Sequence, residues 1–250
     1  MFFHDKMNRK NGESSTIDEI LNTDAFNSLR IDFKSLDLKI EGGNKFEIRY
    51  QGPEVNKPEL RNENGIVILK ETNNSIERMK NWGHKHIKIE VNITESALVY
   101  ITIPKTVELE NLQAVLASGD CNISDVAIKE ISITAFSGDL KAQNIRTNSF
   151  DAEVTSGDIT FAKMRVDQSN LSLTSGDFKI ENSRIEDQLF VSTTSGDNYV
   201  KNTKADRYNL NTMNGDNLLF GELLDNVVTN GKEGSLISLK TISGDNVVEK

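Results

Sequence analysis

The chain has 250 residues, 38 acidic against 29 basic side chains, three prolines and one cysteine. A formal charge of −9 without a run of basic residues argues against a nucleic-acid partner, because neutralising phosphates needs a basic face. One cysteine excludes an internal disulfide and a zinc or redox centre built from cysteine pairs. No window approaches the roughly 20 consecutive apolar residues of a membrane span, although a leader or anchor could have been trimmed from this sequence.

Residues 1–25 are polar and irregular, and we expect a tail or linker there, with at most a short helix at Ser15 to Leu21. Residues 26–118 are predicted to form an N-terminal β region that leads into a repeat. Apolar residues alternate from Leu29 to Phe33, from Leu36 to Ile40 and from Phe46 to Tyr50, which predicts hairpins. Three further strands are expected at Ile66 to Lys70, Ile87 to Ile93 and Leu98 to Ile103.

A Ser-Gly-Asp repeat organises residues 119–250. Successive glycines lie 19, 19, 19, 20, 19 and 29 residues apart, and a degenerate copy at Glu233 to Ser235 falls inside the long interval. A fixed period of this length is typical of stacked structural repeats. The predicted turn residues are Gly119, Asp120, Gly138, Asp139, Gly157, Asp158, Gly176, Asp177, Gly196, Asp197, Gly215, Asp216, Gly244 and Asp245.

Apolar residues recur at fixed places after each glycine, when that glycine is counted as position one. They fall at positions three and five and again at thirteen, fifteen and seventeen, so each repeat contains two alternating strands. One coil cannot bury both faces alone, but parallel stacking buries them continuously. The sequence therefore predicts an all-β fold: a parallel β-solenoid with about 19-residue two-strand coils, preceded by an irregular β-sheet region. About seven coils are expected after residue 100.

The repeated aspartates have two interpretations. Each carboxylate can cap its own turn by accepting hydrogen bonds from backbone N–H groups, or the row can bind cations, because stacked coils place carboxylates about 4.8 Å apart. The single glycine and long period differ from the GGxGxD nonapeptide of calcium-binding β-rolls, which favours capping. The repeat is therefore predicted to be structural, with no metal or cofactor.

Few residues point to catalysis. His84 and His86 could share a strand face and offer two imidazoles to a metal, but without an identifiable third ligand a loop or edge-strand pair is favoured. Residues 119–250 contain no histidine, so the usual Ser-His pair cannot form there. Glu222 and Asp225, in the longest irregular stretch, are expected in a solvated turn. We predict that the protein is not an enzyme.

Several of these features together resemble a known family. The opening strand pair at Leu29 to Ile40, the Tyr50-Gln51-Gly52 step, the strand end at Ile103 to Lys105 and the serial Ser-Gly-Asp coils are similar to the family called "putative adhesin". This is a bacterial β-strand-repeat domain of unknown function, with relatives among LiaX-type cell-envelope stress proteins. The resemblance covers about residues 26–250.

The resemblance implies a non-catalytic binding or sensing module of the bacterial cell envelope. It implies a location in the envelope or outside the cell, reached through an anchor absent from this sequence, with the cytoplasm as the alternative. The expected partner is an envelope protein, peptide or glycan. A structural spacer remains the alternative function, and a carbohydrate-active solenoid enzyme is less favoured. A binding module should show an apolar patch or a row of aromatics on one flat sheet, for which Tyr199, Tyr208 and Phe220 are candidates, although Tyr208 falls at an inward position.

Overall fold

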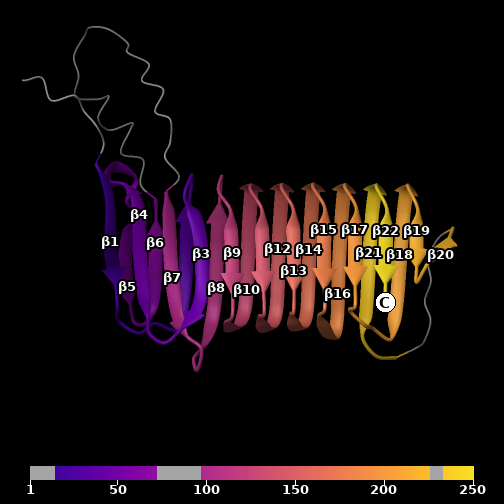
Figure 1. Ribbon diagram of the computed structural model, residues 1–250, viewed down its shortest axis with the longest axis horizontal. Coiled ribbons are helices and arrows are strands. Elements are labelled where there is room, and N and C mark those ends of the chain that lie inside the picture. The colour runs from indigo at the N-terminus through magenta and orange to yellow at the C-terminus, as the bar shows by residue number, and fades with distance from the viewer. Residues whose placement is uncertain (1–14, 72–96, 226–232) are drawn as a thin grey trace, which may run out of the picture.

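The computed structural model describes residues 15–71, 97–225 and 233–250, which form an elongated β rod (Figure 1). Two sheets of 12 and 10 strands run along the rod, and most strands lie across its long axis. The short segment η1 (Glu54–Asn56) is a single 3-10 turn. Within the described residues, no helix is long and apolar enough to cross a membrane.

The strands of each sheet follow a spatial order along the rod that departs from chain order. From one end to the other, the 12-stranded sheet contains β1 (Thr16–Asn22), β4 (Glu47–Pro53), β7 (Leu98–Pro104), β3 (Asp37–Gly43), β9 (Cys121–Ser124), β11 (Leu140–Gln143), β13 (Ile159–Ala162), β15 (Phe178–Glu181), β17 (Asn198–Lys201), β22 (Asn246–Glu249), β19 (Asn217–Leu219) and β20 (Glu222–Leu224). Starting from the opposite end of the rod, the 10-stranded sheet contains β18 (Arg207–Asn214), β21 (Leu236–Ser243), β16 (Arg184–Ser195), β14 (Arg165–Ser175), β12 (Arg146–Ser156), β10 (Ala127–Ser137), β8 (Glu108–Leu116), β2 (Ser28–Phe33), β6 (Ile66–Lys70) and β5 (Glu59–Glu63).

Each coil contributes one long strand to the 10-stranded sheet and one short strand to the other. Equivalent residues of successive coils are direct neighbours, as in the register of Ile133 with Ala152 and of Ala152 with Leu171. The alternating apolar side chains of both sheets point inward and fill one continuous core. Each fully buried aliphatic or aromatic side chain contributes about 1.5–3 kcal/mol relative to exposure. The predicted parallel β-solenoid is confirmed.

The N-terminal segment differs from the prediction. The helix expected at residues 15–21 is wrong, because this segment forms β1, which pairs antiparallel with β4. Pairing with β4 satisfies backbone groups that a short isolated helix would leave unpaired. Arg49 on β4 forms an ion pair with Asp18 on β1. Sheet pairing therefore decides the structure of a segment whose composition is polar.

Both hairpins predicted for residues 29–50 are also wrong. β2 and β3 lie in different sheets and form a coil of the solenoid, and β7 separates β3 from β4. Leu36, at the turn between β2 and β3, is fully buried, so the chain passes across the core instead of folding back. A hairpin does join β5 to β6 through Asn64 and Gly65, which both have positive φ. The strand expected at residues 87–93 lies outside the described residues.

At both ends of the rod, the order of coils in space differs from their order in the chain. The coil β2/β3 lies between β6/β7 and β8/β9, and the last coil in the chain, β21/β22, lies between β16/β17 and β18/β19. The first and last complete coils of the described chain therefore lie inside the stack, each between two other coils. The degenerate copy expected at Glu233 to Ser235 is wrong as a coil turn, because Gly234 lies beside Asp206, outside the Ser-Gly-Asp row.

A short ladder of buried amides joins the last three coils. Asn198, Asn246 and Asn217 occupy the inward position that Phe178 holds in the neighbouring coil, and all three are at most 1% exposed. Asn198 Nδ2 donates to Asn246 Oδ1 at 2.9 Å, and Asn246 Nδ2 donates to Asn217 Oδ1 at 2.8 Å. A buried amide is costly beside an apolar neighbour, so this ladder favours the pairing of these three coils with one another.

The central amide provides a test of the coil order. We expect Asn246→Leu to lower the free energy of unfolding by about 2–4 kcal/mol, because it leaves polar atoms of Asn198 and Asn217 buried without their partner. Urea denaturation would measure this loss. A triple variant with leucine at 198, 246 and 217 should recover at least half of it. A triple variant less stable than Asn246→Leu alone would contradict the ladder's role.

Candidate binding surfaces

The repeated aspartates form a ladder along one edge of the rod. The Oδ1 atom of each aspartate except the last in space, Asp216, accepts the backbone N–H of the aspartate in the next coil, over seven bonds of 2.8–3.1 Å. In spatial order the members are Asp37, Asp120, Asp139, Asp158, Asp177, Asp197, Asp245 and Asp216. The carboxylates therefore cap turns, but each caps the neighbouring coil's turn. The expectation that each caps its own turn is wrong, because these N–H groups point along the stack.

Asp37 belongs to this ladder although the Ser-Gly-Asp motif does not include it. Its turn reads Lys34-Ser35-Leu36 and lacks the glycine of the repeat. The carboxylate of Glu71 caps this turn from the β6 side, accepting the N–H groups of Lys34 and Ser35 at 2.6 and 2.8 Å. The one signal in the sequence is the position of Asp37 inside the alternating run from Leu36 to Ile40.

Two features of the repeat turn require glycine: a positive φ and the close approach of the neighbouring turn. Gly157 has a φ of 139°, which a side chain disfavours, and an added Cβ would lie 2.2 Å from the carbonyl oxygen of Gly138. The same close approach recurs at the other stacked repeat turns after Gly138. Glycine at this place therefore lets the backbones of consecutive turns touch.

The geometry favours capping over cation binding. The Oδ1 atoms that accept turn N–H groups are committed to the backbone, and Asp139 also has Lys141 Nζ at 3.3 Å. Among the residues that the structure describes, no group of three or more histidine, cysteine, aspartate or glutamate side chains could hold a metal ion. His84 and His86 lie outside the described residues.

Removing one cap gives a direct test. Asp158→Ala should lower the free energy of unfolding by about 1 kcal/mol, because the N–H of Asp177 loses its acceptor. Asp158→Asn keeps an Oδ1 acceptor and relieves repulsion along the row, so its stability should stay within about 0.5 kcal/mol of the parent. Thermal and urea denaturation measure both values.

The control for these variants is Asp167→Ala, which removes an exposed carboxylate from the outer face of the same coil. It should change the stability by less than about 0.5 kcal/mol. Millimolar calcium should leave the Tm of the parent nearly unchanged. A calcium-dependent rise of more than about 5 °C that Asp158→Asn abolishes would contradict capping as the ladder's main role.

A second feature lies on the outer face of the 12-stranded sheet, where one outward residue per strand forms a row that we call the central stripe. It contains four cations, two tyrosines and no carboxylate, in a chain whose formal charge is −9. In spatial order the stripe is Ile20, Arg49, Tyr100, Lys39, Asn122, Lys141, Thr160, Lys179, Tyr199, Val247, Leu218 and Leu223.

The stripe's tyrosines are held in place by charged neighbours. Lys39 Nζ lies 5.6 Å from the centre of the Tyr100 ring, and Lys179 Nζ lies 5.8 Å from that of Tyr199. The Tyr199 hydroxyl donates to Glu249, and this hydrogen bond raises the pKa of Tyr199 and lowers that of the Glu249 carboxyl. Cation–π contacts and ion pairs of this kind fix the side chains of a flat polar surface.

The three aromatic residues that the sequence suggested for a contact surface lie in different parts of the structure. Tyr199 lies on the outer face, Tyr208 is 6% exposed and belongs to the core, and Phe220 is 42% exposed at the C-terminal end of the rod. Cys121 is buried, and burial raises its pKa to about 12, so the thiol is protonated at neutral pH. The stripe itself was not predicted, although position four of each repeat marks its members once the coil is known.

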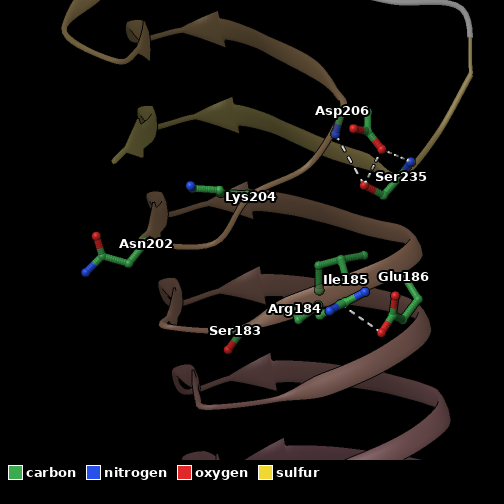
Figure 2. Close-up of a pocket in the computed structure, with 8 residues that line it drawn as sticks. All are labelled: Ser183, Arg184, Ile185, Glu186, Asn202, Lys204, Asp206 and Ser235. Atoms are coloured by element: carbon green, nitrogen blue, oxygen red, sulfur yellow. Dashed lines mark hydrogen bonds and ion pairs between the residues drawn. The ribbon is translucent and has the colours of Figure 1, made fainter.

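A shallow pocket of about 450 Å³ opens where the coil order changes (Figure 2). β21 begins at Leu236, opposite Gln188, so the first residues of β16 have no β21 partner. The segment at 202–206 crosses this gap and touches β16 through a single bridge between Arg184 and Lys204. The pocket is lined by Ser183, Arg184, Ile185, Glu186, Asn202, Lys204, Asp206 and Ser235. Because it depends on long-range coil order, no local sequence pattern predicted it.

The fold and its capped turns define a class of two-sheet parallel solenoid proteins. The family model described as Toastrack DUF4097 matches residues 26–249, and the chain belongs to this family. This confirms the family resemblance drawn from the sequence, while a relation to LiaX-type proteins stays a prediction. No curated protein matches the chain.

Solved structures are similar to this chain over nearly their whole length. A "putative lipid binding protein" from Parabacteroides distasonis is 12% identical, with a TM-score of 0.50 over 95% of this chain and 98% of that one. A "putative adhesin" from Bacteroides fragilis is 11% identical, with a TM-score of 0.47 over 95% and 98%. A "putative cell adhesion protein" from Clostridium sporogenes is 12% identical, with a TM-score of 0.44 over 94% and 100%. At these identities the likeness concerns the fold alone.

Proposed function

We propose that this protein is a non-catalytic binding module of the bacterial cell envelope, and that the outer face of its 12-stranded sheet is the contact surface. The observation that carries the proposal is the central stripe. Its tyrosines and cations stand in register at the strand spacing of about 4.8 Å on one sheet. Such a surface offers ring faces, hydroxyls and ammonium groups to a long polar partner, whether a glycan, a peptide or an envelope protein.

The charge around the stripe supports a polar partner. Lys39, Lys141 and Lys179 each have a carboxylate within 3.3 Å, from Glu41, Asp139 and Glu181 respectively. Paired charges of alternating sign bind hydroxyl and amide groups without demanding a ligand of one net charge. The names of the solved relatives, which speak of adhesion and lipid binding, belong to those proteins, and the proposal extends only the general idea of binding to this chain.

A structural spacer is the competing function, and the stripe distinguishes the two. A spacer needs only a long and stable rod, and the capped turns and the apolar core already supply one. It has no use for a row of four cations and two tyrosines in register on the outer face of one sheet. Half-buried tyrosines that each lie beside a lysine, as Tyr100 does with Lys39 and Tyr199 with Lys179, are typical of contact surfaces.

The stripe predicts a specific loss of binding. Retention of the purified protein on washed bacterial cell walls and membranes should fall at least about 5-fold in a double variant with alanine at Lys179 and Tyr199, because a hot-spot pair contributes about 1 kcal/mol or more. Phe190→Ala, on the outer face of the opposite sheet, is the matched aromatic control and should retain binding within about 2-fold. Equal retention of the parent and the stripe variant would favour the spacer.

Localisation is tested separately by fractionating cells that express the native, untrimmed gene. The proposal expects the protein in the envelope or extracellular fraction. An exclusively cytosolic protein would remove the envelope from the proposal, whatever the stripe binds.

A further inference from the structure

The cations of the central stripe are spaced regularly along the rod. They lie on every second strand of the 12-stranded sheet, at β4, β3, β11 and β15, so successive cations are about 10 Å apart. Each strand between or beside them contributes a neutral side chain that can form hydrogen bonds. From β4 to β17 the row therefore alternates strictly between a cation and a neutral polar residue: Arg49, Tyr100, Lys39, Asn122, Lys141, Thr160, Lys179 and Tyr199.

The stability of the sheet does not by itself account for this alternation. Like charges on adjacent strands repel, which explains why no two of these cations are neighbours. Opposite charges on adjacent strands attract, so a row selected for stability alone would carry carboxylates between the cations. The stripe carries none there, and the carboxylates that pair with its lysines lie two residues away along the chain, at Glu41, Asp139 and Glu181.

The lysines remain accessible although each is paired. The side chains of Lys39, Lys141 and Lys179 are 41%, 53% and 47% exposed. Each pair of ammonium and carboxylate has a net charge near zero and offers both hydrogen-bond donors and acceptors. A ligand with a regular series of hydroxyl groups can therefore bind at every second strand, whereas a polyanion would have to displace the carboxylates.

The spacing of the cations distinguishes between classes of linear ligand. An extended peptide repeats on one face every two residues, about 7 Å, and so falls out of register with the stripe. A polyproline II peptide repeats every three residues, about 9 Å, but it binds grooves lined with aromatic side chains, and this part of the stripe has only Tyr100 and Tyr199. In a straight β-1,4-linked glycan alternate sugars are turned over, so equivalent groups return once per disaccharide, a length close to two strand spacings.

We propose that the alternating part of the central stripe, from Arg49 to Tyr199, binds an uncharged β-1,4-linked glycan that lies along the rod. This inference rests on the proposed function and specifies the ligand of the same surface. Four sugars reach from Lys39 to Lys179, about 19 Å, and six reach from Tyr100 to Tyr199, about 29 Å. The lysine–carboxylate pairs bind sugar hydroxyls, and the neutral residues bind polar groups of the sugars between them.

NMR of the full chain tests this proposal through the amide signals of Asn122, Lys141 and Thr160. Saturable shifts are expected with cellohexaose, with hexa-N-acetylchitohexaose or with both, and their relative affinities show whether an acetamido group contributes. The affinity should rise at least about 10-fold from the disaccharide to the hexasaccharide, because the longer chain contacts more of the lysine pairs. Maltohexaose contains the same sugars as cellohexaose in α-1,4 linkage and follows a curved path, so it should cause no saturable shift.

Variants separate the spacing of the cations from their charge. Lys141→Gln should weaken the affinity for the hexasaccharide by about 5-fold or more. A double variant with Lys141→Gln and Thr160→Lys keeps the charge of the stripe but moves its central cation by one strand, and it should not recover the affinity. Lys240→Gln, which removes an exposed lysine from the outer face of the 10-stranded sheet, is the matched control and should change the affinity by less than about 2-fold.

The proposal is overturned if neither β-1,4-linked hexasaccharide causes a saturable shift up to about 10 mM. It is also overturned if maltohexaose binds equally well, if the double variant binds like the parent, or if a proline-rich peptide binds in place of the glycans. These results differ from a failure of the proposed function. Retention on cell walls that depends on Lys179 and Tyr199, in a protein that binds neither glycan, would keep the stripe as the contact surface and remove only the glycan.

Discussion

One backbone N–H per coil constrains the rest of this molecule. At each stacked turn the glycine N–H and the N–H after the aspartate both reach carbonyl oxygens of a neighbouring coil, as Gly138 N–H does with Ser156 and Leu140 N–H with Asp158. The N–H of the aspartate itself finds no carbonyl and is accepted by a carboxylate from the coil on the other side. Stacking therefore favours a side-chain oxygen acceptor at this place in the coil, and in the Ser-Gly-Asp turns it favours glycine beside it so that the backbones can touch.

The same constraint assigns charge to the surface. Because the carboxylates on this edge are used by the fold, their negative charge is structural, and the lysines next to them form ion pairs such as that of Lys141 with Asp139. The 12-stranded sheet can then carry tyrosines and cations in register on its outer face. The pocket arises where the stack departs from its regular order, between β16 and the crossing segment at 202–206.

The sequence was sufficient for the features that are local and repeated. The spacing of the glycines and the alternation of residues such as Ile131 and Ile133 predict coil length, inward faces and turn positions, because each coil experiences the same surroundings. The sequence was insufficient where pairing with a strand far away in the chain determines the structure. Residues 16–22 become a strand through β4, Asp37 joins the ladder through β9, and the pocket exists because β21 enters between β16 and β18. No pattern within the segments themselves specifies those neighbours.

The exchanged coil order at both ends has a mechanical consequence. In a simple solenoid the terminal coil has one neighbour, so tension on the chain end can peel the rod one turn at a time. In this rod, tension applied through the C-terminal residues acts first on β21/β22, which is hydrogen-bonded to coils on both sides, and two interfaces must separate before the end extends. At the other end, the first described strand, β1, lies at the edge of the 12-stranded sheet and pairs only with β4, whereas β2/β3 is hydrogen-bonded on both sides, to β6/β7 and β8/β9. The exchanged order therefore resists peeling at the C-terminal end, whereas at the N-terminal end β1 must leave β4 before tension reaches the doubly held coil β2/β3.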